Sequence, residues 1–366
     1  MFCKALSLPD TSPIKVMIRF PVTSVLVSCF LAAFGSLTAK TFKVYILAGQ
    51  SNMEGKVQDI LIEHQAKDPK TAKLFAHLRK GDLWITRDDV LIKYGNKHGG
   101  LTKGYGSRGK YTGLELEYGT ALGNHHKEPV LLIKTCWGGH SLYQKFRPPS
   151  AKLPSQEFLG KELVNRIKHT KQNNEKHNRN DPLPTMADIK AAYGASYRQM
   201  MKEVRQTLTN YAILFPSLKG KKPELAGFVW FQGWNDQYNG AEKEYASNMK
   251  HFISDLRKDL KSPRLPFVIG VIGQNGSTPA KGAMKVIQDA QISMEKIPEF
   301  KGNVKAVRTD ILVDKAAETL YPEWKKRFEE WQKVGSDRGY HYYGSAIWFG
   351  RIGKAMAEAS IALEKK

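Results

Sequence analysis

One serine of this chain stands where a serine can act as a nucleophile. The run from Val44 to Gly55 has the pattern of a buried strand that ends in Gly49-Gln50-Ser51-Asn52, a small, turn-forming segment. In an open α/β sheet, ligands bind beyond the carboxyl ends of the strands, so the Ser51 hydroxyl is expected to face that site. A polar turn with a helix-capping serine fits the same residues, and this segment alone leaves both interpretations open.

Two later segments carry groups that can stabilise an oxyanion. An apolar strand from Val130 to Thr135 is followed by Gly138 and Gly139, and paired glycines let backbone N–H groups approach a ligand closely. A shorter apolar strand, Phe228 to Phe231, is followed by Asn235, whose amide can join those N–H groups around a developing negative charge. Together they predict an anion-binding cradle.

A base for acyl transfer lies near the C-terminus. The run from Asp337 to Gly344 places an acid and a histidine, His341, just before a stretch with the pattern of an amphipathic helix. A serine hydroxyl is a poor nucleophile until a neighbouring imidazole takes its proton. The serine, the cradle and the histidine are the parts that acyl transfer requires.

These four segments, in this order, resemble the sequence blocks of the SGNH (GDSL-like) hydrolase superfamily. Gly-Gln-Ser-Asn in place of Gly-Asp-Ser, together with Trp-Gly-Gly and Trp-Phe-Gln-Gly, is more similar still to the sialate O-acetylesterase domain and to carbohydrate esterase family six, which includes acetyl xylan esterases. The likeness runs from about Lys43 to about Ala362. One block is a weak signal, whereas four in order are a specific one.

The resemblance implies roles for particular residues. Ser51 would be the nucleophile, and His341 would be the general base that later protonates the leaving alcohol. The oxyanion hole would comprise the Ser51 N–H, a backbone N–H at Gly138 or Gly139, and the Asn235 amide. The implied reaction is hydrolysis of O-acetyl esters of carbohydrates through an acyl-enzyme.

The acid of the triad departs from the superfamily pattern. That pattern places an aspartate three residues before the histidine, but Arg338 stands there and the nearest acid, Asp337, lies four residues before His341. Asp337 is expected to reach His341 if the loop is bulged, and a backbone carbonyl near Arg338 or Gly339 is the alternative. Because a triad acid orients the ring without taking its proton, an enzyme with a poor one would be slower but active.

Four residues beside these blocks are expected substrate contacts: Gln50, Gln232, Trp137 and Trp234. The two amides also suit bracing of the loops, and the two tryptophans suit either a floor under a sugar ring or wall packing. Glu115 matches a glutamate of the resembled family and is expected either to hydrogen-bond the nucleophile loop or to cap a helix.

No cofactor or metal ion is predicted. The histidines His125, His126 and His140 have no acid or cysteine nearby in the sequence at the spacing of metal ligands.

The order of strands and helices predicts a three-layer α/β/α sandwich with a central parallel sheet, and the resemblance implies the flavodoxin-like SGNH hydrolase fold. Further strands are expected from Pro266 to Val271 and from Val304 to Thr309. Apolar residues recurring at three and four positions predict helices at Leu116–Gly123, Ser196–Leu214, Ala241–Leu260, Lys285–Lys296 and Ser345–Leu363.

We expect one esterase domain over residues 40–366, because the blocks span that length and no linker divides it. It carries two insertions, near 83–111 and near 146–184. Within the first, Leu83 to Tyr94 alternates like a hairpin arm and Gly95 to Tyr111 is typical of a mobile loop. The middle of the second is polar and basic, which favours disorder.

The first 39 residues resemble a secretory signal peptide, since basic residues precede an apolar stretch from Phe20 to about Phe34 and small residues follow up to Ala39. This predicts export to the periplasm or the extracellular space, with no stable membrane insertion after cleavage; an uncleaved anchor is the alternative. Cys136 is the only cysteine after the leader, so no internal disulfide is expected.

The chain carries a net charge of +22, most of it after the leader. Such a balance favours polyanionic surroundings. The expected partner is an acetylated oligo- or polysaccharide, and an anionic one is the hypothesis that the charge suggests, with a merely solvated basic surface as the alternative. Nucleic acid is a poor fit to an exported chain without a recognisable binding module.

Two other functions stay open at this point. The irregular triad acid suggests a non-catalytic carbohydrate-binding protein on an esterase fold, because fold does not fix function. A general carboxylesterase would share every catalytic residue and differ only in its loops. Loss of Ser51 separates an enzyme from a binding module, since it costs an enzyme about 10⁶ in turnover and leaves binding nearly unchanged.

Overall fold

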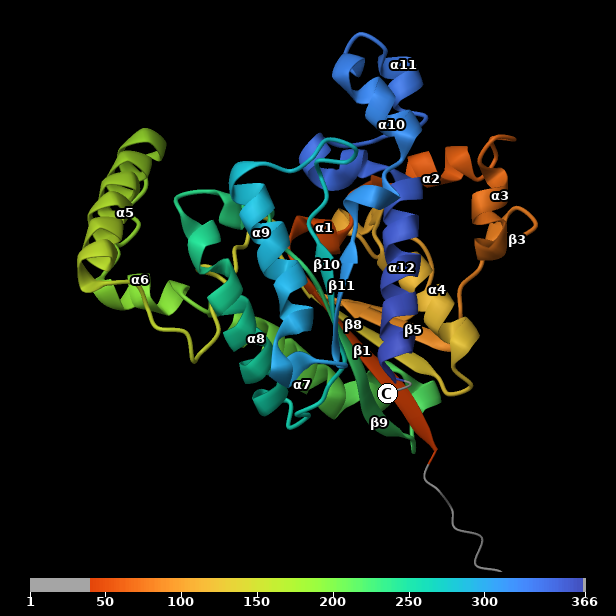
Figure 1. The fold of residues 1–366 in the computed structure, drawn as a ribbon, viewed down its shortest axis with the longest axis horizontal. Coiled ribbons are helices and arrows are strands. Elements are labelled where there is room, and N and C mark those ends of the chain that lie inside the picture. The colour runs from red at the N-terminus through yellow and green to blue at the C-terminus, as the bar shows by residue number, and fades with distance from the viewer. Residues whose placement is uncertain (1–39, 365–366) are drawn as a thin grey trace, which may run out of the picture. The chain divides into compact units, whose positions relative to one another are not determined.

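A seven-stranded sheet forms the centre of the structure, a computed structural model that describes residues 40–364 (Figure 1). All neighbouring strands pair in parallel except the edge pair β5–β6, which is antiparallel. In spatial order the strands are β11 (Val304–Arg308), β10 (Phe267–Val271), β9 (Lys222–Phe231), β1 (Thr41–Gly49), β8 (Val130–Cys136), β5 (Val90–Tyr94) and β6 (Lys97–Gly100).

The central strands are apolar on both faces because helices cover both. Along β1, Val44, Ile46 and Ala48 enter one hydrophobic core, whereas Tyr45 and Leu47 enter the other. A nearly continuous apolar run is typical of parallel strands that are buried on both faces.

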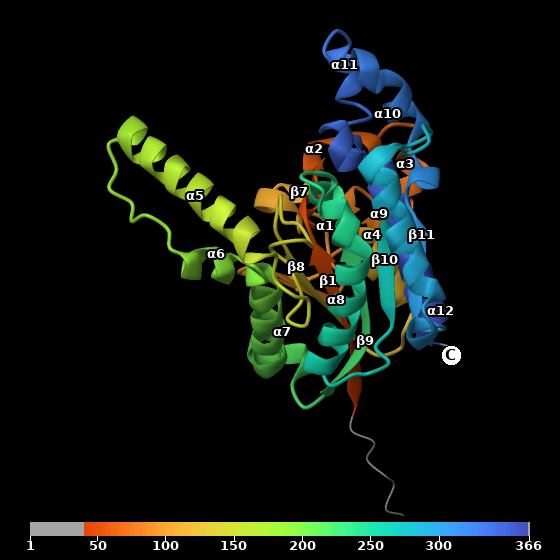
Figure 2. The ribbon, with the colours of Figure 1, turned by 60° about the vertical axis from the view of Figure 1, so that its left-hand side comes forward.

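Two sets of helices form the outer layers (Figures 1 and 2). One core includes side chains of α4 (Glu115–His125) and α12 (Ala346–Glu364). The other includes side chains of α7 (Ala195–Leu214), α8 (Tyr245–Asp259) and α9 (Gly282–Ser293). The predicted α/β/α sandwich with a central parallel sheet is therefore confirmed. The predicted helices are also present, with ends shifted by a few residues.

Shorter elements lie outside these layers. The helices are α1 (Ser51–Glu54), α2 (Asp59–Gln65), α3 (Ala72–Phe75), α10 (Lys315–Leu320) and α11 (Phe328–Trp331), and the two small antiparallel pairs are β2 (Val57–Gln58) with β7 (Tyr111–Thr112) and β3 (Arg79–Lys80) with β4 (Leu83–Trp84). The predicted leader, residues 1–39, lies outside the described residues. Among residues 40–364, no helix is long and apolar enough to cross a membrane.

The first predicted insertion contributes to the central sheet. The hairpin comprises β5 and β6, joined at Gly95 with φ +56°. The predicted arm over Leu83–Tyr94 is therefore confirmed for its second half, Val90–Tyr94, whereas part of the predicted loop over Gly95–Tyr111 is the partner strand. Alternation of polar and apolar residues looks the same in an isolated hairpin and in a hairpin that belongs to the edge of the main sheet. Glycine at a positive φ supplied the turn one residue beyond the predicted arm.

The second predicted insertion is largely helical, so disorder in its middle is a wrong prediction. It contains α5 (Gln156–His177) and α6 (Met186–Ala192), and Figure 2 shows α5 extending away from the sheet. Ser155 caps α5 by accepting a hydrogen bond from the Phe158 N–H, and Leu159 is the one α5 residue that is buried. A helix that exposes nearly all its faces lacks the apolar period on which a sequence-based prediction depends.

A fully buried ion pair fixes the helix that begins at Ser51. The Lys134 ammonium, on β8, donates to Glu115 Oε2 at 2.8 Å, to the Glu54 carbonyl at 2.9 Å and to the Tyr105 carbonyl at 2.8 Å. Both charged side chains are 0% exposed. Glu115 therefore reaches the nucleophile loop through Lys134, which anchors the end of α1.

Loss of the Glu115 carboxylate should destabilise the protein strongly, because it leaves a buried ammonium without its counter-charge. We expect Glu115→Ala to lower the free energy of unfolding by about 3–5 kcal/mol, measured by urea denaturation near neutral pH. The control is Glu157→Ala, which breaks an ion pair with Lys161 whose side chains are 78% and 72% exposed and should cost less than about 1 kcal/mol. Equal losses in the two variants would contradict this account.

Candidate active site

Ser51 lies at the carboxyl end of β1, at the first residue of α1. The turn that precedes it needs a glycine, because a Cβ at Gly49 would lie 2.2 Å from the Phe231 carbonyl oxygen. Strand β9 thus passes directly beside the turn, and Gln50 N–H donates to the same carbonyl. The serine side of the site is set by close packing of two parallel strands.

A chain of hydrogen bonds joins three of the predicted catalytic residues. Ser51 Oγ lies 3.0 Å from His341 Nε2, and His341 Nδ1 lies 3.0 Å from Asp337 Oδ2. With the ring proton on Nδ1, His341 donates to the carboxylate and accepts from the serine hydroxyl. In this tautomer the imidazole can take the serine proton.

The fold of the loop accounts for the unusual spacing of Asp337 and His341. The segment Gly339–Gly344 is a 3₁₀ turn, and the N–H groups of His341 and Tyr343 both donate to the Arg338 carbonyl. His341 and the two tyrosines after it have non-helical φ and ψ values, so the chain folds back on Arg338 and the Asp337 carboxylate comes beside the His341 ring. The structure therefore brings Asp337 to His341 although the family spacing is absent.

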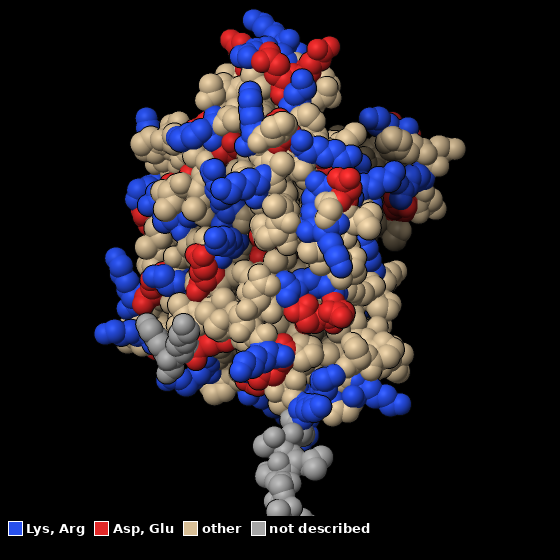
Figure 3. All heavy atoms as spheres, turned by 90° about the vertical axis from the view of Figure 1, so that its right-hand side faces the viewer, with Lys and Arg blue, Asp and Glu red and all other residues tan. Residues whose placement is uncertain are grey.

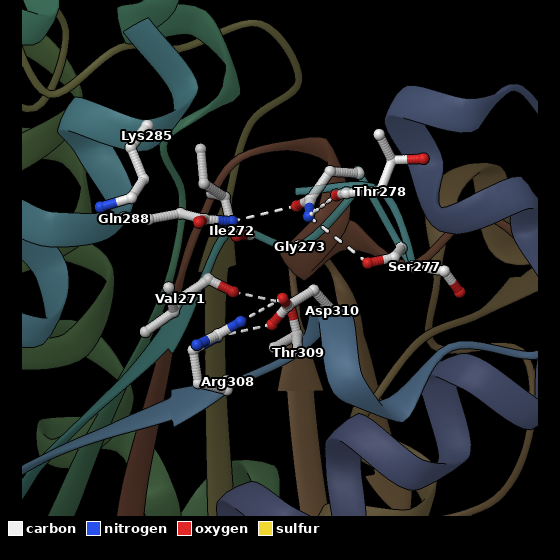
Figure 4. Close-up of polar contacts among 12 residues, drawn as sticks. Val271, Ile272, Gly273, Ser277, Thr278, Lys285, Gln288, Arg308, Thr309 and Asp310 are labelled. Atoms are coloured by element: carbon white, nitrogen blue, oxygen red, sulfur yellow. Dashed lines mark hydrogen bonds and ion pairs between the residues drawn. The ribbon is translucent and has the colours of Figure 1, made fainter. Parts of the chain in front are cut away.

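Two tyrosines hold this loop in an unfavourable backbone conformation. Tyr342 and Tyr343 have φ values of +54° and +60°, a region that costs a non-glycine residue about 1–2 kcal/mol. Tyr342 is fully buried, and its hydroxyl accepts from the Gly273 N–H at 2.8 Å and lies 2.9 Å from Thr309 Oγ1. The Thr309 hydroxyl in turn donates to the Val271 carbonyl (Figure 4). The ends of β10 and β11 thus position His341.

The pKa of Asp337 lies below its usual value. Burial by itself would raise that pKa, but the hydrogen bonds from His341 and from the Arg338 N–H, with the charges of His341 and Lys56, outweigh it. The carboxylate therefore stays ionised and keeps its interaction with the His341 ring over a wide range of pH.

The oxygen of the Asn235 side-chain amide accepts a hydrogen bond, which fixes the orientation of the amide. Gln50 Nε2 donates to Asn235 Oδ1 at 2.9 Å, so the Asn235 NH₂ group points away from that contact. Gln50 Oε1 accepts from the N–H groups of Gly233 and Asn235 and from Gln232 Nε2. Gln50 and Gln232 are each 1% exposed, which favours the bracing alternative over sugar contacts for both.

One of the expected oxyanion donors already donates its hydrogen bond to a carboxylate. The Gly138 N–H donates to Glu54 Oε1 at 3.1 Å, and Glu54 Oε2 accepts from Lys56 at 2.7 Å. A Cβ at Gly138 would lie 3.8 Å from Ser51 Cβ, so this glycine does adjoin the serine. Glu54 is not among the site residues predicted from the sequence, although its position one turn after Ser51 on the same short helix was a signal for it.

Asp236 was also missed, and it ties two loops together. Its carboxylate accepts from the N–H groups of Leu142 and Tyr143 and from Gln232 Nε2. Burial raises the pKa of Asp236 to about 6, although these hydrogen bonds oppose the shift. The loop after β8 is thereby fixed to the loop after β9.

Both candidate tryptophans pack one face against a protein ring and stay partly exposed. Trp137 stacks on His140, with ring centroids 6.1 Å apart, and Trp234 lies 5.8 Å from the Tyr340 ring. Wall packing and sugar contact are both compatible with this arrangement.

One pair of histidines has an acid beside it after all. Ligand atoms of His125, His126 and Glu364 lie within 4.8 Å of one another, because α12 brings Glu364 to the end of α4. Glu364 is far from these histidines in the sequence, so a prediction from nearby residues could not include it. The Tyr45 hydroxyl contacts His126 Nε2 and donates to Glu364, so these three side chains are already hydrogen-bonded to one another.

Replacing Asp337 by asparagine should make the fold less stable in a pH-dependent way. A carboxylate with a lowered pKa stabilises the folded state above its unfolded value of about 3.9, and this contribution is lost as the pH falls through the folded value. Asp337→Asn should therefore unfold more readily than wild type near neutral pH, and the difference should shrink below about pH 3. Urea titrations over this range measure it, and a difference that stays constant with pH would contradict the assignment.

Comparison with known proteins finds one matching family. The family described as "Carbohydrate esterase, sialic acid-specific acetylesterase" matches residues 41–180 and 185–319, a range that contains Ser51, Gly138 and Asn235 but ends before Asp337 and His341. No curated protein matches the chain.

Several solved structures are similar to this one. NanS is 14% identical, covers 88% of this chain and 97% of its own, and has a TM-score of 0.47. An Arabidopsis thaliana protein is 15% identical over 87% of this chain and 97% of its own, also with a TM-score of 0.47. A carbohydrate acetylesterase from Xanthomonas citri is 13% identical over 74% of this chain and 50% of its own, with a TM-score of 0.41.

Proposed function

This chain belongs to the sialic acid-specific acetylesterase family of carbohydrate esterases, and from that premise we propose that it is an exported serine esterase that removes O-acetyl groups from carbohydrates through an acyl-enzyme. The observation that carries the serine mechanism is the pair of 3.0 Å hydrogen bonds that link Ser51 to His341 and His341 to Asp337. They give the hydroxyl a base and give the base a fixed tautomer.

The reaction begins when Ser51 Oγ attacks the acetyl carbonyl carbon while His341 Nε2 takes the hydroxyl proton. The tetrahedral intermediate collapses, the sugar oxygen leaves, and His341 returns the proton to it, so that acetyl-Ser51 and a free sugar hydroxyl remain. A water molecule then attacks the acetyl group with His341 again as the base, and acetate is released. Asp337 stays ionised and stabilises the imidazolium at each proton transfer.

The oxyanion is stabilised by donors from three loops. The Ser51 N–H and the Asn235 NH₂ group are the two that need no rearrangement, because Gln50 already holds Asn235 by its oxygen. The third is a backbone N–H at Gly138 or Gly139. For Gly138 to take part, Glu54 has to release its N–H, since a carboxylate beside an oxyanion is repulsive.

The substrate that we propose is an acetylated oligo- or polysaccharide, and the predicted leader supports export to the periplasm or the extracellular space. The partly exposed rings of Trp137 and Trp234 suit contact with a sugar. The intact hydrogen-bond chain favours an enzyme over a non-catalytic carbohydrate-binding protein. A general carboxylesterase would use the same residues, so the choice of substrate decides between the two.

Loss of the nucleophile or the base should abolish turnover. We expect Ser51→Ala and His341→Ala each to lower kcat by about 10⁶, and Asp337→Ala to lower it less, by about 10⁴. Acetate release is measured from 4-nitrophenyl acetate, acetylated xylan and O-acetylated sialic acid, with glycan binding by Ser51→Ala as the control for folding. Equal acetate release by wild type and Ser51→Ala would rule out the serine mechanism.

Loss of the Asn235 amide should affect the transition state more than substrate binding. Removal of one oxyanion donor typically lowers kcat by about 10²–10³, so Asn235→Ala should show this loss with little change in KM. Gln237→Ala is the matched control, because its amide lies in the same turn and donates to the Trp234 carbonyl. If both variants retained wild-type kcat, the oxyanion hole would have to lie elsewhere.

A further inference from the structure

A cavity of about 650 Å³ adjoins the candidate active site and runs toward α5. Asn235 is common to the cavity wall and to the proposed oxyanion hole. The other walls come from the loop after β8, including Tyr143, from Tyr193, and from the turn at Tyr238. Its volume falls in the range of about 300–1,000 Å³ that is usual for ligand sites. A substrate that extends beyond its acetylated sugar would enter this space.

One face of α5 forms the far wall of the cavity. The α5 residues that line it recur at intervals of three and four, the spacing of one helix face: Phe158, Lys161, Glu162, Asn165, Arg166 and His169. The helix buries almost nothing of its own, since Leu159 is its one buried residue. Leu159 packs with Ile189 and Tyr193 in a small cluster of its own, so contact with the two main cores does not fix the face that lines the cavity.

The charges on this face favour an anion. Lys161 and Arg166 are cations, and the acids beside them are engaged: Glu162 accepts from Gln144 Nε2 at 2.7 Å and from the Tyr193 hydroxyl at 2.8 Å, and Glu157, outside the cavity lining, accepts from Lys161 at 2.7 Å in an exposed ion pair. The Arg166 guanidinium makes no hydrogen bond or ion pair with another residue of the described range 40–364. Its five N–H donors are free for a planar anion, which a guanidinium binds through two parallel hydrogen bonds.

The overall basic charge does not by itself locate such a site. Figure 3 shows lysines and arginines spread over one face of the molecule with acids among them, not gathered into one patch. The α5 cavity differs because its cations stand beside aromatic rings. Tyr143 lies 6.3 Å from the Phe158 ring and 6.2 Å from the Tyr193 ring, and Phe158 is 42% exposed. Aromatic faces beside cations suit a sugar ring that bears a negative group.

We propose that the α5 cavity is a subsite for a second sugar of the substrate chain, one that carries a carboxylate or sulfate bound by Arg166, with Lys161 beside it. The anionic group then lies on a neighbour of the acetylated sugar. This inference rests on the proposed esterase function and adds to it the class of substrate, an acetylated anionic oligosaccharide.

The experiment compares matched substrates. Acetylated oligosaccharides that contain uronic acids are tested beside the same oligosaccharides after reduction of their carboxyl groups, with 4-nitrophenyl acetate as a substrate too small for the subsite. Arg166→Ala should raise KM for the uronic acid substrate by about 10-fold and leave kcat nearly unchanged, because one charge-assisted contact is lost from binding alone. Its KM for the reduced substrate and its turnover of 4-nitrophenyl acetate should match wild type.

Lys168→Ala is the matched control, since Lys168 is an exposed cation of the same helix that does not line the cavity. If Arg166→Ala and Lys168→Ala gave the same KM for the uronic acid substrate, the subsite would be refuted while turnover of 4-nitrophenyl acetate still supported the esterase. If Arg166→Ala raised KM more for a sulfated acetylated oligosaccharide than for the uronic acid substrate, sulfate would be the preferred group.

A binding measurement keeps this test separate from the esterase assignment. Calorimetry of Ser51→Ala with the deacetylated uronic acid oligosaccharide requires no turnover. We expect Arg166→Ala, combined with Ser51→Ala, to weaken this binding by about 10-fold. An unchanged affinity would overturn the subsite even if wild type proved to be an active esterase.

Discussion

The buried ammonium of Lys134 is the constraint on which the serine side of the site depends. A charge without access to water must have every proton hydrogen-bonded, and here the three acceptors are the Glu115 carboxylate and the carbonyls of Glu54 and Tyr105. Because Glu54 ends the helix that Ser51 begins, α1 cannot shift without uncovering this charge. The position of the serine is thus fixed by electrostatics as well as by the packing of β1 against β9.

The histidine side is held by different means. Its loop contains two consecutive tyrosines at positive φ. Burial of Tyr342 among the loops after β10 and β11, together with packing of Tyr343 against aromatic rings, keeps them there. The amide side depends on a third network, in which Gln50 and Asp236 connect the loops after β1, β8 and β9. Three loops from distant parts of the chain lie within hydrogen-bonding distance of one another because parallel strands end at one edge of the sheet.

The sequence predicted those parts that recur as patterns. Buried strands and amphipathic helices gave the sandwich, and the four blocks predicted which side chains would meet. Helix α5 escaped prediction because its exposed surface has no apolar period. The first strand of the β5–β6 hairpin was predicted, but the lysine and glycine residues of β6 predicted a loop instead of the second strand. The route from Asp337 to His341 requires tyrosines in a conformation that they rarely adopt, and no local pattern predicts that. Glu364 lies beside His126 because the fold brings α12 to the end of α4, although the two residues are far apart in the sequence.

The contact between Glu54 and Gly138 bears on how the site can bind an oxyanion. In this structure the Gly138 N–H donates to the Glu54 carboxylate, and Lys56 balances the charge of that carboxylate. An oxyanion at the same N–H would stand beside that carboxylate, and two like charges at such a distance oppose each other. Asn235 has no such competitor, because Gln50 takes its oxygen and leaves its NH₂ group to the site. The Asn235 side chain is thus the group that could donate to an oxyanion with the least rearrangement.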